Sequence, residues 1–178
     1  MSEQLDLFTG PEKITAETPQ QSSSEVRILF FDLETQKEAK EVGGWGNIHQ
    51  MLLTVGVVWD SLEKKFSTYL EEDVAREVEA HGGISYETQA GAGRLVDRLR
   101  GADLVIGFNV SEFDYRVLQP YASRMENPFD LHEIRTFDML LDIKQRLGFR
   151  LSLNHLAQHT LLTQKEGKDG LYALDLYR

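Results

Sequence analysis

The stretch RILFFDLET, residues 27–35, sets four apolar residues directly before Asp32, which is followed two residues later by Glu34. A run this apolar is typical of a strand in the middle of a covered sheet. Side chains two residues apart in a strand share a face, so the two carboxylates lie roughly 6–7 Å apart at Cα near the strand's carboxyl end. Burying like charges costs free energy, and no Lys or Arg adjoins them in the sequence. A bound cation is therefore the candidate partner.

The composition limits the class of protein. The 178 residues suffice for one domain, and 41% hydrophobic with 27% charged residues is typical of a globular chain. The absence of cysteine excludes disulfides and thiolate metal sites. No apolar run has the length of a membrane span and the N-terminus lacks signal-peptide features, so we expect a cytoplasmic protein with no membrane partner. A net charge of −10 argues against gripping nucleic acid by bulk charge, but not against a nuclease neutralised by divalent metal.

The apolar periodicity predicts an α/β fold. Four strands are expected, at about 26–34, 52–60, 65–70 and 103–109. Four helices are expected, at 87–102, at 111–125 with Ser111 as its cap, at about 136–147 and at about 152–161. Strands that come first as an antiparallel meander and then alternate with helices predict a mixed sheet with helices packed on it. Residues 1–25 are polar and predict a disordered tail, so the domain spans 26–178.

A second motif accompanies the first. The segment 103–114, DLVIGFNVSEFD, puts Asn109 at the end of an apolar strand and Phe113–Asp114 in the first turn of the next helix. FDxET followed by N-x-x-x-F-D resembles the first two motifs of the DEDD superfamily of 3′–5′ exonucleases, which have a ribonuclease H-like fold. The resemblance covers most of residues 26–178 and is to a subgroup of predicted bacterial exonucleases. It implies a ribonuclease H-like mixed sheet, an antiparallel meander followed by parallel strands, flanked by helices.

The resemblance also implies a reaction and its residues. The reaction is metal-dependent hydrolysis of phosphodiester bonds at nucleic-acid 3′ ends, with two Mg²⁺ or Mn²⁺ ions. The catalytic, metal-ligating positions would be Asp32, Glu34 and Asp114, and the substrate-binding positions Leu33, Thr35, Asn109 and Phe113.

Two of the residues near these motifs keep a second interpretation. An Asn that closes a strand, such as Asn109, is often structural. Trp45, in the loop 36–50, either stacks on a base or packs its loop down.

The superfamily's fourth carboxylate has no match. It lies on a late helix as Y-x-x-x-D or H-x-x-x-x-D, whereas Tyr172 and Asp175 are only three residues apart. In the subgroup, a segment like 169–178 precedes one more helix that carries this motif. We therefore expect either that the domain is C-terminally incomplete or that the protein is a weak or inactive nuclease.

Two other pairs have a spacing that could bind metal, the first of them as a replacement for the missing carboxylate. Asp138 and Asp142, and likewise His155 and His159, are spaced i, i+4 on predicted helices. Asp138 matches a position that is usually structural in the superfamily, and the His pair lacks the Glu of a zinc helix. Helix packing or exposure is the favoured interpretation of the histidines.

The tail contains one further motif. QLDLF, residues 4–8, resembles the segment by which bacterial replication and repair proteins dock onto the sliding clamp. The docking residues would be Gln4, Leu5, Leu7 and Phe8, with the apolar side chains filling a pocket. A chance apolar patch is the alternative. Docking on the clamp would favour DNA over RNA as substrate and would raise the local concentration of the protein at that substrate.

Three functions remain open. The leading one is a two-metal 3′–5′ exonuclease that acts on nucleic-acid 3′ ends, with DNA favoured over RNA. The second is a non-catalytic adaptor that binds the clamp or nucleic-acid ends. The third is a ribonuclease H-like endonuclease or resolvase, against which the N-x-x-x-F-D motif argues.

Overall fold

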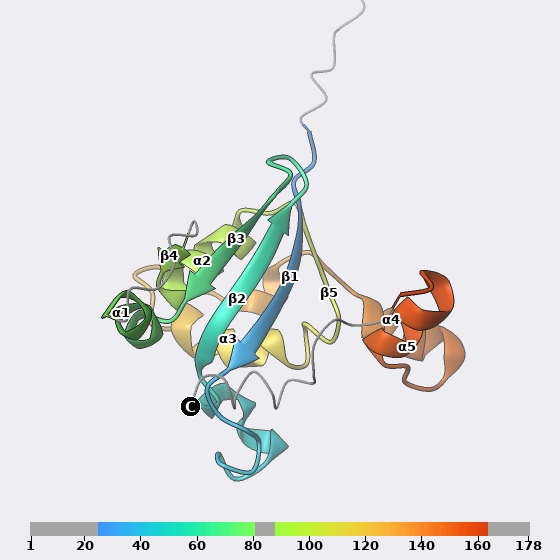
Figure 1. Cartoon of the computed structure of the whole chain (residues 1–178), viewed down its shortest axis with the longest axis horizontal. Helices are drawn as coiled ribbons and strands as arrows, with labels where there is room; N and C mark the ends of the chain where they lie inside the picture. Colours follow the sequence, from blue (N-terminus) through green and yellow to red (C-terminus); the bar gives the residue numbers. More distant parts are fainter. Residues whose placement is uncertain (1–24, 81–87, 164–178) are drawn as a thin grey trace, which may run out of the picture.

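The computed structural model of the chain describes residues 25–80 and 88–163. Its centre is a six-stranded sheet in the order β4-β3-β2-β1-β5-β6 (Figure 1). The strands are β1 (Ile28–Thr35), β2 (Leu53–Asp60), β3 (Lys65–Leu70), β4 (Thr88–Ala90), β5 (Leu104–Gly107) and β6 (Thr136–Asp138). The helices are α1 (Glu72–Ala80), α2 (Ala92–Arg100), α3 (Asp114–Ala122), α4 (Met139–Leu147) and α5 (Leu153–Thr160), with 3₁₀ turns η1 (Trp45–Gln50) and η2 (Leu131–Glu133).

The sheet has the predicted mixture of strand directions. β1, β2 and β3 form an antiparallel meander, and β5 and β6 then add in parallel on the other side of β1. The α/β architecture expected from the sequence is confirmed. None of the described helices is long and apolar enough to cross a bilayer. The proposed clamp-docking residues Gln4, Leu5, Leu7 and Phe8 lie outside the described residues, as do Tyr172 and Asp175.

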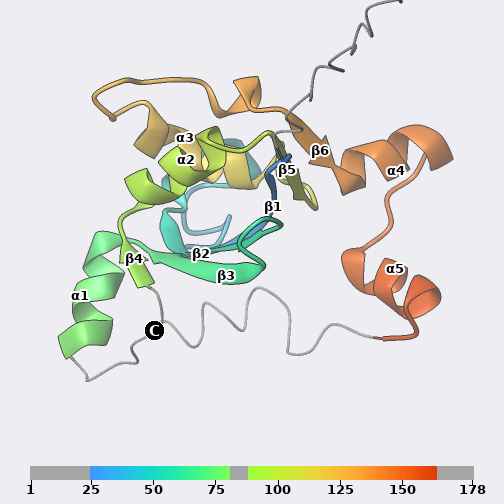
Figure 2. The same ribbon diagram turned by 90° about the horizontal axis from the view of Figure 1, so that it is seen from above.

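The core lies on one face of the sheet. Helices α2 and α3 lie together on this face (Figure 2), and Leu29, Phe31 and Leu33 of β1 point into the core beneath them. The alternate residues Phe30 and Asp32 are exposed, Phe30 by 43%. The prediction of a strand covered on both faces was therefore wrong for the described part of the chain. The sequence alone could not reveal this, because Phe30 on the exposed face is apolar, whereas one-sided strands usually have polar residues at such alternate positions.

The opposite face of the sheet carries a row of apolar side chains, most of them aromatic. Strand register aligns one residue from each of five neighbouring strands, namely Phe66, Trp59, Phe30, Ile106 and Phe137. Phe30 and Trp59 meet edge to face, with ring centroids 5.5 Å apart. The next register row on this face contains Asp32 opposite Val57. The first carboxylate thus stands at the border of an apolar surface.

Three predicted helices begin later than expected, and one helix was not predicted. The segment 87–102 divides into β4 and α2, because Gly91 at φ 103° turns the chain between them. The segment 136–147 divides into β6 and α4 at Asp138. No helix was predicted at the position of α1. Short edge strands such as β4 and β6 depend on pairing with a neighbour, which local sequence does not display.

Ser111 is not the cap of α3. The helix begins after Phe113, with no side-chain cap, and the Ser111 N–H instead donates to the Asp138 carboxylate at 3.0 Å. The prediction failed because a distant acceptor holds this turn in place of the local hydroxyl.

A buried ion cluster closes the end of β2. The Asp60 side chain, 1% exposed, accepts hydrogen bonds from the N–H groups of Leu62 and Glu63 at 2.8 and 3.0 Å and from Arg98 of α2 at 2.6 Å. Burial acts to raise the pKa of Asp60, but these N–H groups and the charges of Arg98 and Arg27 outweigh it, so its pKa is lowered. The carboxylate therefore ties β2 to α2.

Asp60→Asn is expected to lower the free energy of unfolding by about 2 kcal/mol at pH 7, because Arg98 loses its buried counter-charge. A lowered folded pKa means that this contribution is present above the ordinary value of 3.8 and disappears as pH falls through the folded value. Urea denaturation at pH 7 and pH 3 measures both effects. The control is Asp73→Asn, an exposed residue paired with Arg76. A parent–variant difference that persists unchanged at pH 3 would contradict the assignment.

Candidate active site

The candidate site lies where β1 and β5 separate. The two strands pair in parallel only from Ile28 to Phe30 of β1. A Cβ at Gly107, the last residue of β5, would lie 2.9 Å from the Phe31 carbonyl oxygen, so glycine permits this close approach. Beyond it the chain leads to α3, and a crevice of about 320 Å³ adjoins both strands, lined by Asp32 of β1 and Gly107 of β5 among others. Crevices of this kind are the usual ligand sites of α/β sheets.

Asp114 of α3 contacts β1 next to Asp32. It is the first residue of the helix, only 3% exposed, and its Oδ1 accepts a hydrogen bond from the Leu33 N–H at 3.1 Å. Burial and then the charge of Asp32 raise the pKa of Asp114 well above 3.8, although backbone N–H groups act in the opposite direction. The structure therefore brings Asp114 next to the strand that carries Asp32 and Glu34, 80 residues earlier in the chain.

The two carboxylates of β1 occupy the face opposite the core. Asp32 is exposed and lines a hollow of about 320 Å³ together with apolar side chains that include Trp59, Met139 and Leu153. Glu34 is half-buried and lies opposite Val55 of β2. With Asp114 the set offers carboxylate oxygens, the donors that Mg²⁺ and Mn²⁺ prefer. Divalent metal would also offset the repulsion that raises the pKa of Asp114, so the donor chemistry and the charge fit such an ion.

The set is not a closed metal cage. Within residues 25–80 and 88–163 there is no group of three or more His, Cys, Asp or Glu side chains arranged to hold a metal ion. Asp142 is bound to Arg146, with both Oδ atoms accepting from Nε at 3.0 and 2.8 Å. His155 and His159 are exposed and stack on each other, with ring centroids 4.0 Å apart, as the exposure interpretation expected.

Asp138 joins the start of α4 to the turn before α3 through four hydrogen bonds. Its Oδ1 accepts from the N–H groups of Asn109, Leu140 and Leu141, and its Oδ2 from that of Ser111. One carboxylate thus caps α4 and fixes the turn that leads from β5 into α3. An Asp directly before the apolar run MLLDI is a local signal for the cap, but nothing local indicated the two bonds to residues 109 and 111.

The predicted substrate-binding residues lie on β1 and in the turn between β5 and α3. The side chains of Leu33 and Thr35 are buried on the core face, and Thr35 Oγ1 donates to the Lys37 carbonyl at 3.0 Å. Asn109 adopts φ 67°, a left-handed conformation that Asn tolerates better than most residues, so it has a structural role. Phe113 is half-buried and meets Trp45 edge to face. Trp45 itself is 69% exposed, so the interpretation that it packs its loop down was wrong.

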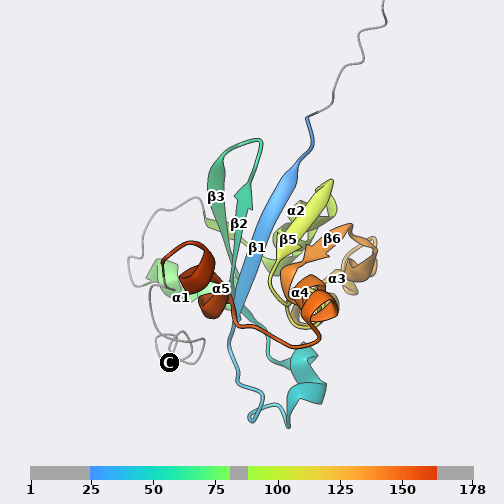
Figure 3. The same cartoon turned by 90° about the vertical axis from the view of Figure 1, so that its right-hand side faces the viewer.

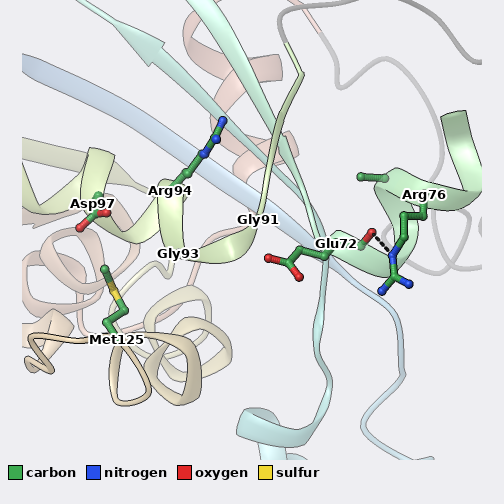
Figure 4. A pocket seen from close by; sticks show the side chains of 8 residues that line it. Glu72, Arg76, Gly91, Gly93, Arg94, Asp97 and Met125 are labelled. Atoms are coloured by element: carbon green, nitrogen blue, oxygen red, sulfur yellow. Dashed lines mark hydrogen bonds between the residues drawn. The ribbon is translucent and has the colours of Figure 1, made fainter.

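A further hollow lies far from these carboxylates, between α1 and α2 (Figure 4). It measures about 570 Å³ and is lined by charges of both signs, including Glu72, Arg94 and Asp97. Arg76 beside it donates to the Glu72 carbonyl at 3.4 Å and pairs with Asp73. Mixed, paired surface charges of this kind are common on solvated helices and indicate no particular chemistry.

Comparison with known proteins supports the fold. A family model described as the RNase_H superfamily matches residues 29–178, which includes β1 and every later element of the sheet. The search of curated proteins finds no match. The mixed sheet flanked by helices is the architecture of this superfamily, so the predicted ribonuclease H-like fold is confirmed. Its members are nucleases that generally use divalent metals.

Proposed function

The chain belongs to the RNase_H superfamily, and from this premise we propose that it is a metal-dependent 3′–5′ exonuclease acting on nucleic acid, DNA in preference to RNA, in the cytoplasm. In the reaction a water oxygen adds to the phosphorus of the last phosphodiester and the bond to the 3′ oxygen breaks. A nucleoside 5′-monophosphate leaves, and the 3′ oxygen of the shortened strand takes up a proton. The catalytic residues would be Asp32, Glu34 and Asp114.

One observation carries the proposal, namely the buried Asp114 carboxylate held against the strand of Asp32. A protein gains no stability from a carboxylate that is 3% exposed and repelled by a neighbouring charge. Such groups cluster at functional sites, where they serve chemistry. The Leu33 N–H donates a hydrogen bond to the Asp114 oxygen at 3.1 Å and so positions the group beside β1.

Asp32, Glu34 and Asp114 would hold two Mg²⁺ or Mn²⁺ ions. When bound, such ions lower the pKa of the attacking water and neutralise the charge that develops on the leaving oxygen. The chain's own contribution is to orient these oxygens. β1 presents two of them on one face, and α3 brings the third through the hydrogen bond to Leu33. The main chain at Leu33 and Thr35, with Asn109 and Phe113, would position the 3′-terminal nucleotide.

The test is digestion of a 5′-labelled single-stranded oligonucleotide with Mg²⁺ or Mn²⁺. The parent is expected to yield a ladder that shortens from the 3′ end, and Asp32→Ala to lose more than about 100-fold in rate, because even residues that only orient metal ligands cost 10–100-fold. Asp73→Ala, on the distant helix α1, is the matched control and should keep full activity. Internal cuts in a circular substrate would indicate an endonuclease instead.

A non-catalytic adaptor is the second candidate. It is favoured by the absence, among the described residues, of a group of three or more metal ligands. An adaptor would bind the labelled oligonucleotide without shortening it, under conditions in which Mn²⁺ is present in excess. Absence of the ladder with retained binding would therefore select the adaptor over the nuclease.

We propose that residues 4–8 recruit the protein to the sliding clamp. Leu7 and Phe8 would fill an apolar pocket, as anchor residues of short docking motifs do. The full chain is expected to bind the clamp in surface plasmon resonance, and the double variant Leu7→Ala, Phe8→Ala to bind at least about 10-fold more weakly, the loss of one such anchor. Ile14→Ala, in the same tail, is the control. Equal binding by the double variant would reject the docking motif.

A further inference from the structure

A second cleft lies beside the start of α3, the helix whose first residue is Asp114. It has a volume of about 440 Å³ and is lined by three separate segments, namely η1, the start of α3 and the residues after α4. Figure 3 shows η1 beyond the carboxyl end of β1, on the side of α3 and α4. Its principal lining residues are Trp45, Asn109, Glu112, Phe113, Arg116 and Arg150.

Trp45 is held at the mouth of this cleft by a well-anchored loop. Val42 and Ile48 on either side are buried, and Asn47 Nδ2 donates to the Val42 carbonyl at 2.8 Å. Arg116 Nη2 reaches the Gly46 carbonyl at 3.3 Å. The neighbours therefore fix the loop, while the indole itself remains exposed and meets the ring of Phe113 edge to face at 6.4 Å between centroids. An indole held outward in this way offers a flat face to a ligand.

Two guanidinium groups line the same cleft. Arg116 is half-buried and Arg150 is exposed, and neither forms an ion pair with a carboxylate in the part of the chain that the structure describes. Glu112 is the one acidic residue among the lining side chains. In a chain of net charge −10, two arginines beside an exposed indole are a local reversal of charge. Arginine is the side chain best suited to bind phosphate through paired N–H donors.

We propose that this cleft binds the single-stranded segment of nucleic acid next to the nucleotide being removed. Trp45 stacks on an unpaired base, while Arg116 and Arg150 bind the neighbouring phosphates. Phe113 lines the cleft and directly precedes Asp114, so a strand bound here leads to the carboxylates. The inference rests on the proposed nuclease function. It also explains how so acidic a protein holds a polyanion, since stacking supplies affinity without positive charge.

The test uses the full chain and oligothymidylate in EDTA, so that binding is measured without cleavage. The chain has two tryptophans, so Trp59→Phe leaves Trp45 as the sole indole and its fluorescence reports stacking directly. We expect quenching on titration, and about 5- to 150-fold weaker binding of a labelled oligonucleotide by Trp45→Ala. Arg116→Gln with Arg150→Gln should reduce the slope of log K against log[salt] by about 1.4, or 0.7 for each lost phosphate contact. Arg76→Gln with Arg94→Gln, on α1 and α2, removes the same two charges outside the cleft and should change neither quantity.

Each outcome bears on a different claim. Unchanged Trp45 fluorescence, in a protein that still shortens the oligonucleotide with Mn²⁺, overturns the cleft and leaves the exonuclease standing. Equal loss of salt dependence in Arg76→Gln with Arg94→Gln also overturns it, because the effect would then be one of overall charge. If the protein neither binds nor shortens the oligonucleotide, both the proposed function and the inference are rejected. Far-UV circular dichroism and melting temperatures confirm that the surface variants are folded.

Discussion

Asp114→Asn is expected to stabilise the metal-free protein by about 2 kcal/mol, because the amide removes a buried charge and its repulsion from Asp32. The amide oxygen can still accept the hydrogen bond from the Leu33 N–H, so the local geometry is retained. The same change should lower exonuclease activity by more than about 100-fold. Gain of stability with loss of function is the behaviour of a residue kept for chemistry.

The pH dependence of this gain has a definite sign. The folded pKa of Asp114 is raised, so the protonated carboxyl is favoured in the folded state. Its stabilising contribution is present below the ordinary pKa and is lost as pH rises through the raised value. Urea denaturation in EDTA should therefore show parent and variant alike near pH 3.5 and increasingly different toward pH 8. An Asn variant that is less stable than the parent at pH 8 would show that Asp114 is a structural acceptor instead.

Bound metal is expected to stabilise the parent more than Asp114→Asn, which is opposite to the order of stability in the metal-free state. Saturating Mn²⁺ is expected to raise the melting temperature of the parent, by about 2.7 kcal/mol in unfolding free energy at 100 times the dissociation constant. Asp114→Asn should respond much less, since it lacks one of the ligands. Asp73→Asn, remote from the crevice, should respond like the parent.

Asp138→Ala is expected to lower the free energy of unfolding by about 3 kcal/mol. Four backbone N–H groups lose their acceptor, including that of the buried residue Leu140, and each donor left unsatisfied costs about 1–3 kcal/mol where water cannot replace the carboxylate. Loss of a helix cap alone costs only about 1 kcal/mol. Thermal and urea denaturation distinguish the two sizes of effect.

The matched control for this change lies one turn further along α4. Asp142→Ala removes a carboxylate paired with Arg146 at the surface, a pair worth about 0.3–0.5 kcal/mol. Similar losses in the two variants would mean that Asp138 acts only as a cap. A loss confined to Asp138→Ala, accompanied by slower exonuclease digestion in conditions where the variant is folded, would show that the turn from β5 to α3 positions Asp114.

Much of the sheet was determined locally. The apolar runs of β1, β2, β3 and β5 are long enough to be recognised as strands without their neighbours. Asp32 and Glu34 share a face because side chains in a strand alternate, whatever surrounds it. The motif around Asp114 likewise placed this residue at the start of a helix, where the structure has it. These features follow from periodicity over a few residues.

Other features depend on what lies across the fold. β6 exists because three residues pair with β5, and Asp138 binds the turn at 109–111 from 27 residues or more away. Arg116 of α3 and Arg150, which follows α4, line one cleft only because the fold brings these two segments together. Local sequence carries no record of such partners, since any residue of suitable type at the right place in space would serve.

The sequence by itself determined four of the six strands, which carboxylates share a face and which family's motifs they match, because these depend on local periodicity and residue identity. Only the tertiary structure decided that β1 is covered on one face, that Asp114 is buried against the Leu33 N–H, and that the exposed Trp45 lines the same cleft as two arginines. Burial and charge environment are sums over neighbours distant in the chain. They set the pKa of Asp114, and with it the chemistry proposed for the site.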